Sequence, residues 1–230
     1  ASTAGLGLVV AWGASFTIQK IAFREMGPDT FLFLRSALMA LCAAALLRWR
    51  GRVLWPRLGP GQWPAFLTAT AAGPVLHIAL VTYAIYWSTA FSVALIMAIG
   101  PVITLILLRL LRGTRLARRQ WLGVGAAFCG VLLVMSDKLL AAEWRASGGD
   151  LAMLAATVVF SLYTIWITPY VVEHGGVEVM CWTTVLASPV LMLLSISAVI
   201  AAPLAGLAPE TWAAFGWTVI VSAFIGWMVW

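Results

Sequence analysis

Long apolar stretches separated by short polar connections run through the whole chain. The clearest stretch extends from Ala90 to Leu108 without a charged residue; it is followed by the arginine-rich segment 109–119, and a second apolar stretch begins at Trp121. An apolar run of this length crosses a bilayer core of about 30 Å at roughly 1.5 Å per residue. The pattern therefore predicts a membrane hairpin with a basic connecting loop.

The same pattern predicts further spans on both sides of this hairpin, so the expected fold class is an all-α, polytopic membrane protein. Apolar segments of this length cross the bilayer as helices, because the lipid offers the backbone no hydrogen-bonding partner. The predicted spans are residues 4–24, 31–49, 63–87, 90–111, 121–137, 151–171, 177–202 and 212–230. The connection 138–150 carries both signs of charge and is the natural midpoint.

Composition agrees with this interpretation and removes one class of partner. The chain is 63% hydrophobic and 10% charged, whereas soluble domains average about 25% charged residues. The net charge of +6 does not indicate nucleic acid, since most of the cations lie in segments 48–57 and 109–119 and leave no basic face. Both segments are expected in the cytoplasm by the positive-inside bias, which places the amino terminus inside and 138–150 outside.

No catalytic or metal-binding pattern stands out in the sequence. The 3 cysteines all fall within predicted spans, and no glycine-rich phosphate loop or nucleophile with an identifiable base is present. We therefore expect no enzyme, no cofactor and no metal. All 8 acids fall in loops or at span ends, which disfavours proton coupling through a buried carboxylate and favours facilitated transport. The alternative to a transporter, from another class of protein, is a membrane-embedded lipid enzyme or a non-transporting scaffold.

Several polar and aromatic residues lie at helical spacing and are candidates for binding a solute. Residues three and four apart share a helix face; in this way Thr157, Ser161, Thr164 and Thr168 form a hydroxyl stripe. Such stripes serve either close helix packing or a mildly polar cavity wall suited to zwitterions and neutral metabolites. The candidate substrate-binding residues are Trp12, Phe16, Gln19, His77, Tyr83, Tyr86, Met97, Phe160, Tyr163 and Thr164.

Span 63–87 carries two candidate sets that do not share a face. Tyr83 and Tyr86 lie roughly opposite His77, so both sets cannot easily line one straight pathway. We favour the tyrosines for a cavity wall, with an aromatic belt as the alternative. His77 either forms a hydrogen bond with a substrate or changes its protonation state during transport. The alternative is a structural histidine whose hydrogen bonds are made between helices. Pro74 and Pro101 are candidate hinges, although a static kink explains either proline.

Two cations lie near the predicted outer ends of the first two spans. Lys20 and Arg35 either reach the interface and pair with Glu25 and Asp29, or attract a substrate carboxylate at the outer mouth. The sequence leaves both possibilities open.

The chain also resembles a known family. The motif residues are Pro101, Arg112–Leu116, Gln120, Gly123 and Gly130-Val131, together with an opening set of Trp12-Gly13, Phe16, Lys20, Pro28 and Arg35. They are similar to the signatures of EamA-type members of the drug/metabolite transporter superfamily. Thr114 and Gly100 depart from the pattern, since the family usually has Glu at the first position and often an acid at the second.

This resemblance implies two inverted five-helix repeats and ten spans, of which about eight lie in this chain. Residues 1–137 would form the first repeat, 138–150 the outer connection, and 151–230 an incomplete second repeat, with helices 9 and 10 beyond residue 230. The sequence Trp63–Phe66 is echoed by Trp212–Phe215, and the cationic loop 50–62 corresponds to a loop at 203–211 without a cation. An internal repeat with reversed charge bias fits inverted topology.

The resemblance further implies a multi-pass transporter of the bacterial inner membrane that works as a monomer. Its expected function is export of small metabolites by alternating access, with amino acids, including aromatic and neutral ones, as the first candidates. This expectation follows the amino-acid exporters of the superfamily, which the chain resembles in architecture. Drugs, or nucleoside- and sugar-related metabolites, are the alternative substrates.

Overall fold

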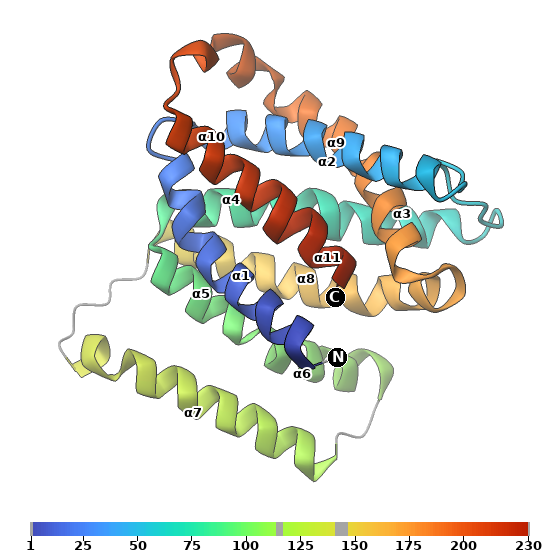
Figure 1. Ribbon diagram of the computed structural model, residues 1–230. Helices are drawn as coiled ribbons and strands as arrows, with labels where there is room; N and C mark the ends of the chain where they lie inside the picture. Colours follow the sequence, from blue (N-terminus) through green and yellow to red (C-terminus); the bar gives the residue numbers. More distant parts are fainter. Residues whose placement is uncertain (1, 114–116, 141–146, 230) are drawn as a thin grey trace.

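The computed structural model describes residues 2–113, 117–140 and 147–229, and within these ranges the chain is a bundle of helices without strands (Figure 1). Residues 114–116 of the arginine-rich loop and residues 141–146 of the predicted midpoint connection lie outside the described residues. The elements are α1 (Ser2–Ala22), α2 (Pro28–Trp49), α3 (Trp63–Thr70), the π-helix η1 (Ala71–His77), α4 (Ile78–Trp87), α5 (Ala90–Ala98), α6 (Gly100–Arg112), α7 (Arg118–Leu140), α8 (Gly148–His174), α9 (Gly176–Ala201), the 3-10 helix η2 (Leu204–Gly206), α10 (Pro209–Gly216), the π-helix η3 (Trp217–Ile225) and α11 (Gly226–Val229).

Each predicted span is occupied by helix, and the predicted all-helical membrane fold is confirmed. Among the described residues, 5 helical stretches are long and apolar enough to cross a membrane: Pro28–Trp49, Trp63–Trp87, Ala90–Arg112, Gly148–His174 and Gly176–Ala201. Boundaries move where a cap decides them. The eighth α-helix begins at Gly148 rather than 151, because the Ser147 and Asp150 side chains each accept a hydrogen bond from the other residue's backbone N–H.

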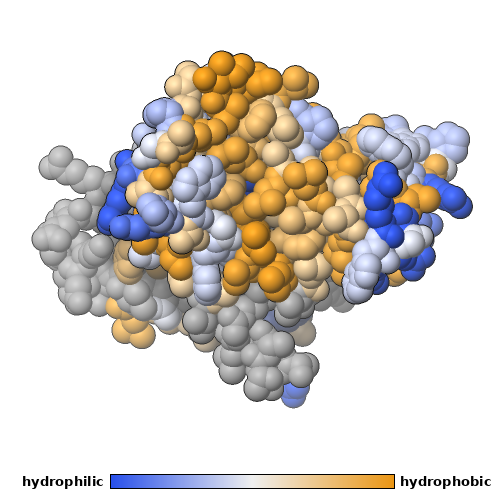
Figure 2. All heavy atoms as spheres, turned by 45° about the horizontal axis from the view of Figure 1, so that its top comes forward, coloured by the Kyte–Doolittle hydropathy of each residue, from blue (hydrophilic) through white to orange (hydrophobic). Residues whose placement is uncertain are grey.

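The exterior of the bundle is apolar across its middle. Figure 2 shows hydrophobic residues gathered over the centre of one face, with hydrophilic residues at two opposite ends. Leu41, Leu193 and Ile200 are exposed to 68%, 72% and 79%. Patches of this kind are a liability for a protein in water but carry no cost against lipid tails. The surface is thus that of a membrane protein.

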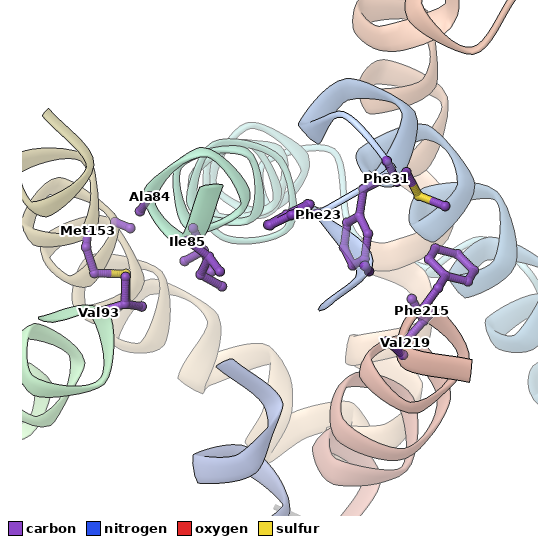
Figure 3. Packing of buried hydrophobic residues seen from close by; sticks show 13 residues of the cluster. Phe23, Phe31, Ala84, Ile85, Val93, Met153, Phe215 and Val219 are labelled. Carbon is purple, nitrogen blue, oxygen red and sulfur yellow. The ribbon is translucent and has the colours of Figure 1, made fainter. Parts of the chain in front are cut away.

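One end of the bundle, which we call the phenylalanine end, is closed by a buried cluster around Phe23, Phe31 and Phe215. Their rings meet edge to face, with centroids 5.0 Å apart for Phe23 and Phe31 and 5.4 Å for Phe31 and Phe215. Figure 3 shows Val93 and Met153 within the same cluster. Edge-to-face aromatic pairs add stability beyond the area they bury, so this end is firmly packed.

The opposite end, which we call the arginine end, contains Arg50 and Arg52. Both lie 3.4 Å from the buried carboxylate of Glu178 at the start of α9. The indole Nε1 of Trp182 donates to the carbonyl of Val53 at 2.9 Å. These contacts fasten the loop after α2 to α9, and the two helices pack against each other extensively.

Two helices that are far apart in sequence each pack against a π-helical segment. The first helix, α1, packs on α10 and η3, whereas α8 packs on α3, η1 and α4. Figure 1 shows α1 crossing beside the red carboxy-terminal helices and α8 running beneath α4. The elements that pack on α1 include the π-helix η3, and those that pack on α8 include the π-helix η1. Such segments are uncommon and are frequently found at functional sites.

Candidate functional site

A cavity of about 610 Å³ lies among α1, α2, η1, α4, α8 and η3. Its volume falls within the range of roughly 300–1,000 Å³ that is typical of small-molecule sites. It ends at Ile85 and Met97, which belong to the cluster at the phenylalanine end, and extends to Gly176 and Val177 at the arginine end. Of the residues predicted from the sequence, those lining it are Trp12, Phe16, Gln19, His77, Met97, Phe160, Tyr163 and Thr164.

The two predicted tyrosines of α4 do not line this cavity. The hydroxyl of Tyr83 donates to the carboxylate of Asp29 at the start of α2, and the ring of Tyr86 packs edge-on against Phe23. His77 lines the cavity, whereas Tyr83 and Tyr86 are not among its described lining residues. They lie in the last turns of the span, where aromatic side chains meet the phenylalanine end.

His77 forms one end of an aromatic wall. Its ring lies 4.7 Å from that of Phe160 between centroids, and Phe160 lies 6.1 Å from Tyr163. The Nδ1 atom of His77 is 3.0 Å from the carbonyl oxygen of Ala156. A carbonyl can only accept, so Nδ1 carries the proton and Nε2 of a neutral ring remains an acceptor. The histidine is therefore both a satisfied contact between helices and part of the cavity wall.

Close approach of α8 to η1 depends on Gly73. A Cβ atom added at this position would lie 2.4 Å from Cγ and Cδ2 of Tyr163, well inside van der Waals contact. Tyr163 is buried and lines the cavity. The absence of a side chain at Gly73 thus lets the tyrosine ring pack closely against the π-helical segment and shape the cavity.

We expect Gly73→Ala to lower the free energy of unfolding by about 1–3 kcal/mol, because the buried ring has to move to accommodate a methyl group. Thermal unfolding in detergent measures the effect, and Gly13→Ala is the control since nothing lies within 4 Å of its Cβ position. The double variant Gly73→Ala/Tyr163→Leu should recover part of the loss. Equal stabilities of Gly73→Ala and Gly13→Ala would contradict the packing argument.

Trp12 makes the corresponding contact on the other side of the bundle. Its indole Nε1 donates to the carbonyl of Ser222 in η3 at 2.9 Å. The spacing that separates Trp63 from Trp212 also separates Gly73 from Ser222. Trp12 and Tyr163 thus each contact one of the two π-helical segments, at positions that keep the spacing of Trp63 and Trp212.

The two predicted hinge prolines occupy irregular places in their helices. Pro74 lies inside η1, and Pro101 follows the break between α5 and α6 at Ile99. Proline cannot donate a backbone hydrogen bond, which is consistent with interruption at both places.

The hydroxyl stripe of α8 divides between the two roles left open by the sequence. Thr157 and Ser161 face α6, where the Thr104 hydroxyl donates to Ser161 Oγ at 2.9 Å. Thr164 and Thr168 line the cavity. The stripe serves packing at one end and the cavity wall at the other.

Of the two roles left open for Lys20 and Arg35, pairing with Glu25 or Asp29 is not found among the described residues. Lys20 donates to the carbonyl of Tyr86 at 3.0 Å. The carboxylate of Glu25 accepts from the hydroxyl of Thr211 at 2.7 Å and from the backbone N–H of Ala208 at 2.8 Å, and these bonds lower its pKa. Arg35, by contrast, lines the cavity itself.

Several cavity residues were not among those predicted. Val81, Ile167 and Met180 are apolar and carry no sequence signal that separates a cavity wall from a core. Thr218 and Ser222 could have been found from the echo of 63–66 in 212–215, because they follow the second copy as Ala69 and Gly73 follow the first. Arg35 was considered only for the outer mouth; it lies seven residues into α2, about 10 Å from the helix start, and lines the cavity.

Comparisons with known proteins agree with this architecture. The sequence pattern described as the EamA-like transporter family matches residues 2–136. An "Uncharacterized transporter YyaM" of Bacillus subtilis (strain 168) is 23% identical over 227 residues, which are 98% of this chain and 74% of the relative. A protein of known crystal structure superposes with a TM-score of 0.67 at 17% identity, over 99% of this chain and 76% of the other. That likeness concerns the fold alone.

Proposed function

Because the chain belongs to the EamA-like transporter family and is thus a membrane transporter, we propose that it exports small metabolites, with amino acids, including aromatic and neutral ones, as the first candidates. The observation that carries the proposal is the aromatic-edged cavity of about 610 Å³, large enough for an amino acid. Its hydroxyls and His77 suit a small polar solute, and its apolar wall suits a hydrophobic side chain. We infer transport rather than catalysis as its role.

The proposed mechanism is alternating access between inverted repeats, with residues 1–137 and 151–230 in the two halves. Support comes from the matching positions of Gly73 and Ser222 in the two π-helical segments and from the aromatic contact that each receives. The cavity extends to the arginine end and is closed at the phenylalanine end, which fits a conformation open to one side.

We place the arginine end in the cytoplasm by the positive-inside bias, with the amino terminus cytoplasmic and the protein in a bacterial inner membrane as a monomer. The cavity is then open toward the cytoplasm, where an exporter collects its substrate. Among the described residues that line it, none is Asp or Glu. This supports transport without proton coupling through a carboxylate, and it speaks against cationic drugs as substrates.

Uptake of a panel of labelled amino acids into proteoliposomes, with and without an imposed pH gradient, tests the proposal. We expect saturable uptake that ignores the gradient. Ser15→Trp should reduce uptake close to that of protein-free liposomes, because Ser15 is buried and lines the cavity. Thr17→Trp on the exposed side of α1 is the matched control and should transport normally.

Two results would change the proposal. Gradient-dependent uptake would replace the facilitated mechanism by a coupled one and make His77 the next residue to vary. Lack of uptake of any amino acid by folded protein would reject amino acids as substrates and move the search to drugs and other metabolites.

A further inference from the structure

Arg35 is a cation held inside the membrane-spanning part of the bundle. It lies on α2, well beyond the first turn, and lines the large cavity together with Gln19 and His77. It also borders a smaller pocket of about 40 Å³ beside Ser36 and Pro74. Charged residues at such depth are costly and are usually explained by a functional partner.

No such partner is found for Arg35 within the described part of the chain. Neither a hydrogen bond nor an ion pair reaches its guanidinium there. The two acids nearest in sequence are engaged elsewhere, since Asp29 accepts from Tyr83 and Glu25 accepts from Thr211. The guanidinium can therefore donate hydrogen bonds to an anionic group of a solute in the cavity.

Gln19 supplies a second unsatisfied group in the same cavity. Its side chain is only 3% exposed, and its amide nitrogen has no hydrogen-bond partner among the described residues. A buried amide left without a partner is unfavourable unless a ligand completes it. The cavity thus contains a cation and an amide donor, while its described lining has no carboxylate that could bind an amine.

We propose that Arg35 binds the carboxylate of the transported solute, with Gln19 as a second donor, and that the cavity selects small organic carboxylates with an apolar body. The planar guanidinium suits a carboxylate because it can donate two parallel hydrogen bonds. The apolar part of the solute then contacts the wall formed by Phe160 and Tyr163. This inference rests on the proposed transport function and specifies its substrate class: the carboxylate is essential, and the ammonium group of an amino acid is dispensable.

Calorimetric titration of the purified protein with three ligands that share a phenyl ring tests the inference. The ligands are phenylalanine, hydrocinnamate, which lacks the ammonium group, and phenethylamine, which lacks the carboxylate. Hydrocinnamate should bind at least as tightly as phenylalanine, and phenethylamine about tenfold or more weakly, as expected for loss of a charged hydrogen bond. Phenethylamine binding as tightly as hydrocinnamate would overturn the inference.

Variants then assign the effect to residues. Arg35→Gln should weaken hydrocinnamate binding by about tenfold or more and abolish the preference over phenethylamine, and Gln19→Leu should weaken it by about threefold to tenfold. Arg48→Gln is the matched control, because Arg48 is exposed on the same helix and does not line the cavity. If Arg35→Gln fails to fold, the ligand series on the unaltered protein and Gln19→Leu still decide.

The titration separates this inference from the proposed function because it measures binding without transport. Arg35-dependent binding of hydrocinnamate, with no amino-acid uptake into proteoliposomes, would retain the carboxylate site and reject amino-acid export. Amino-acid uptake that survives in Arg35→Gln would retain export and reject the role of Arg35.

Discussion

Gly149→Ala should lower the free energy of unfolding by about 2–5 kcal/mol. A Cβ atom at Gly149 would lie 2.7 Å from the backbone nitrogen of Ser88 and 2.8 Å from the carbonyl carbon of Trp87. A backbone cannot turn aside as a side chain can, so α8 has to move away from the end of α4. This shift also disrupts the buried hydrogen bond from the Ser88 hydroxyl to Asp150. If that bond is lost completely, its loss contributes the larger part of the decrease of about 5 kcal/mol at the top of the range.

The neighbouring residue provides a control in the same turn of helix. Nothing lies within 4 Å of a Cβ atom built at Gly148, and alanine is a better helix former than glycine, so Gly148→Ala should be neutral or slightly stabilising. Thermal unfolding in detergent compares the two variants, and the predicted loss corresponds to a fall in Tm of roughly 5–15 °C for Gly149→Ala. Equal Tm values for Gly149→Ala and Gly148→Ala would show that α4 and α8 do not meet this closely.

The span positions were predictable because the bilayer imposes a simple rule. A long apolar segment has to satisfy its backbone internally, so hydropathy alone located the helices that begin at Pro28 and Gly176. The boundaries were less predictable, since they depend on caps such as Ser147, which moves the start of α8. Pro74 marks the irregular helix η1 in the sequence, whereas η3 contains no proline and carries no such local signal.

The candidate site was only partly predictable for the same reason. Helical spacing found one face of α1 and one of α8, since their aromatic and polar residues recur at the right interval. It could not choose between His77 and the pair Tyr83 and Tyr86, because the choice depends on which neighbours each face meets. The partner of Tyr83 is Asp29, 54 residues away along the chain, and no sequence spacing reveals such a contact.

Tyr83→Phe should make the cavity accessible from the side that the phenylalanine end faces. The Tyr83 hydroxyl donates to Asp29 and so links α4 to α2 at this closed end. Loss of one hydrogen bond to a charged group, partly discounted for its exposure, corresponds to about a tenfold rise in the population of a conformation open at this end. The large packed cluster around Phe23 and Phe31 remains intact, so the protein should stay folded.

The measurement is labelling of a cysteine placed in the cavity by Ser15→Cys, after the native cysteines have been replaced, with a membrane-impermeant maleimide in sealed vesicles of known orientation. Tyr86→Phe is the matched control: its ring keeps the contact with Phe23, and Lys20 bonds only the backbone carbonyl of Tyr86. We expect faster labelling from the phenylalanine end in Tyr83→Phe and an unchanged rate in Tyr86→Phe. Equal rates in both variants would mean that the apolar cluster alone keeps this end closed, and the polar contacts would then have no part in the transport cycle.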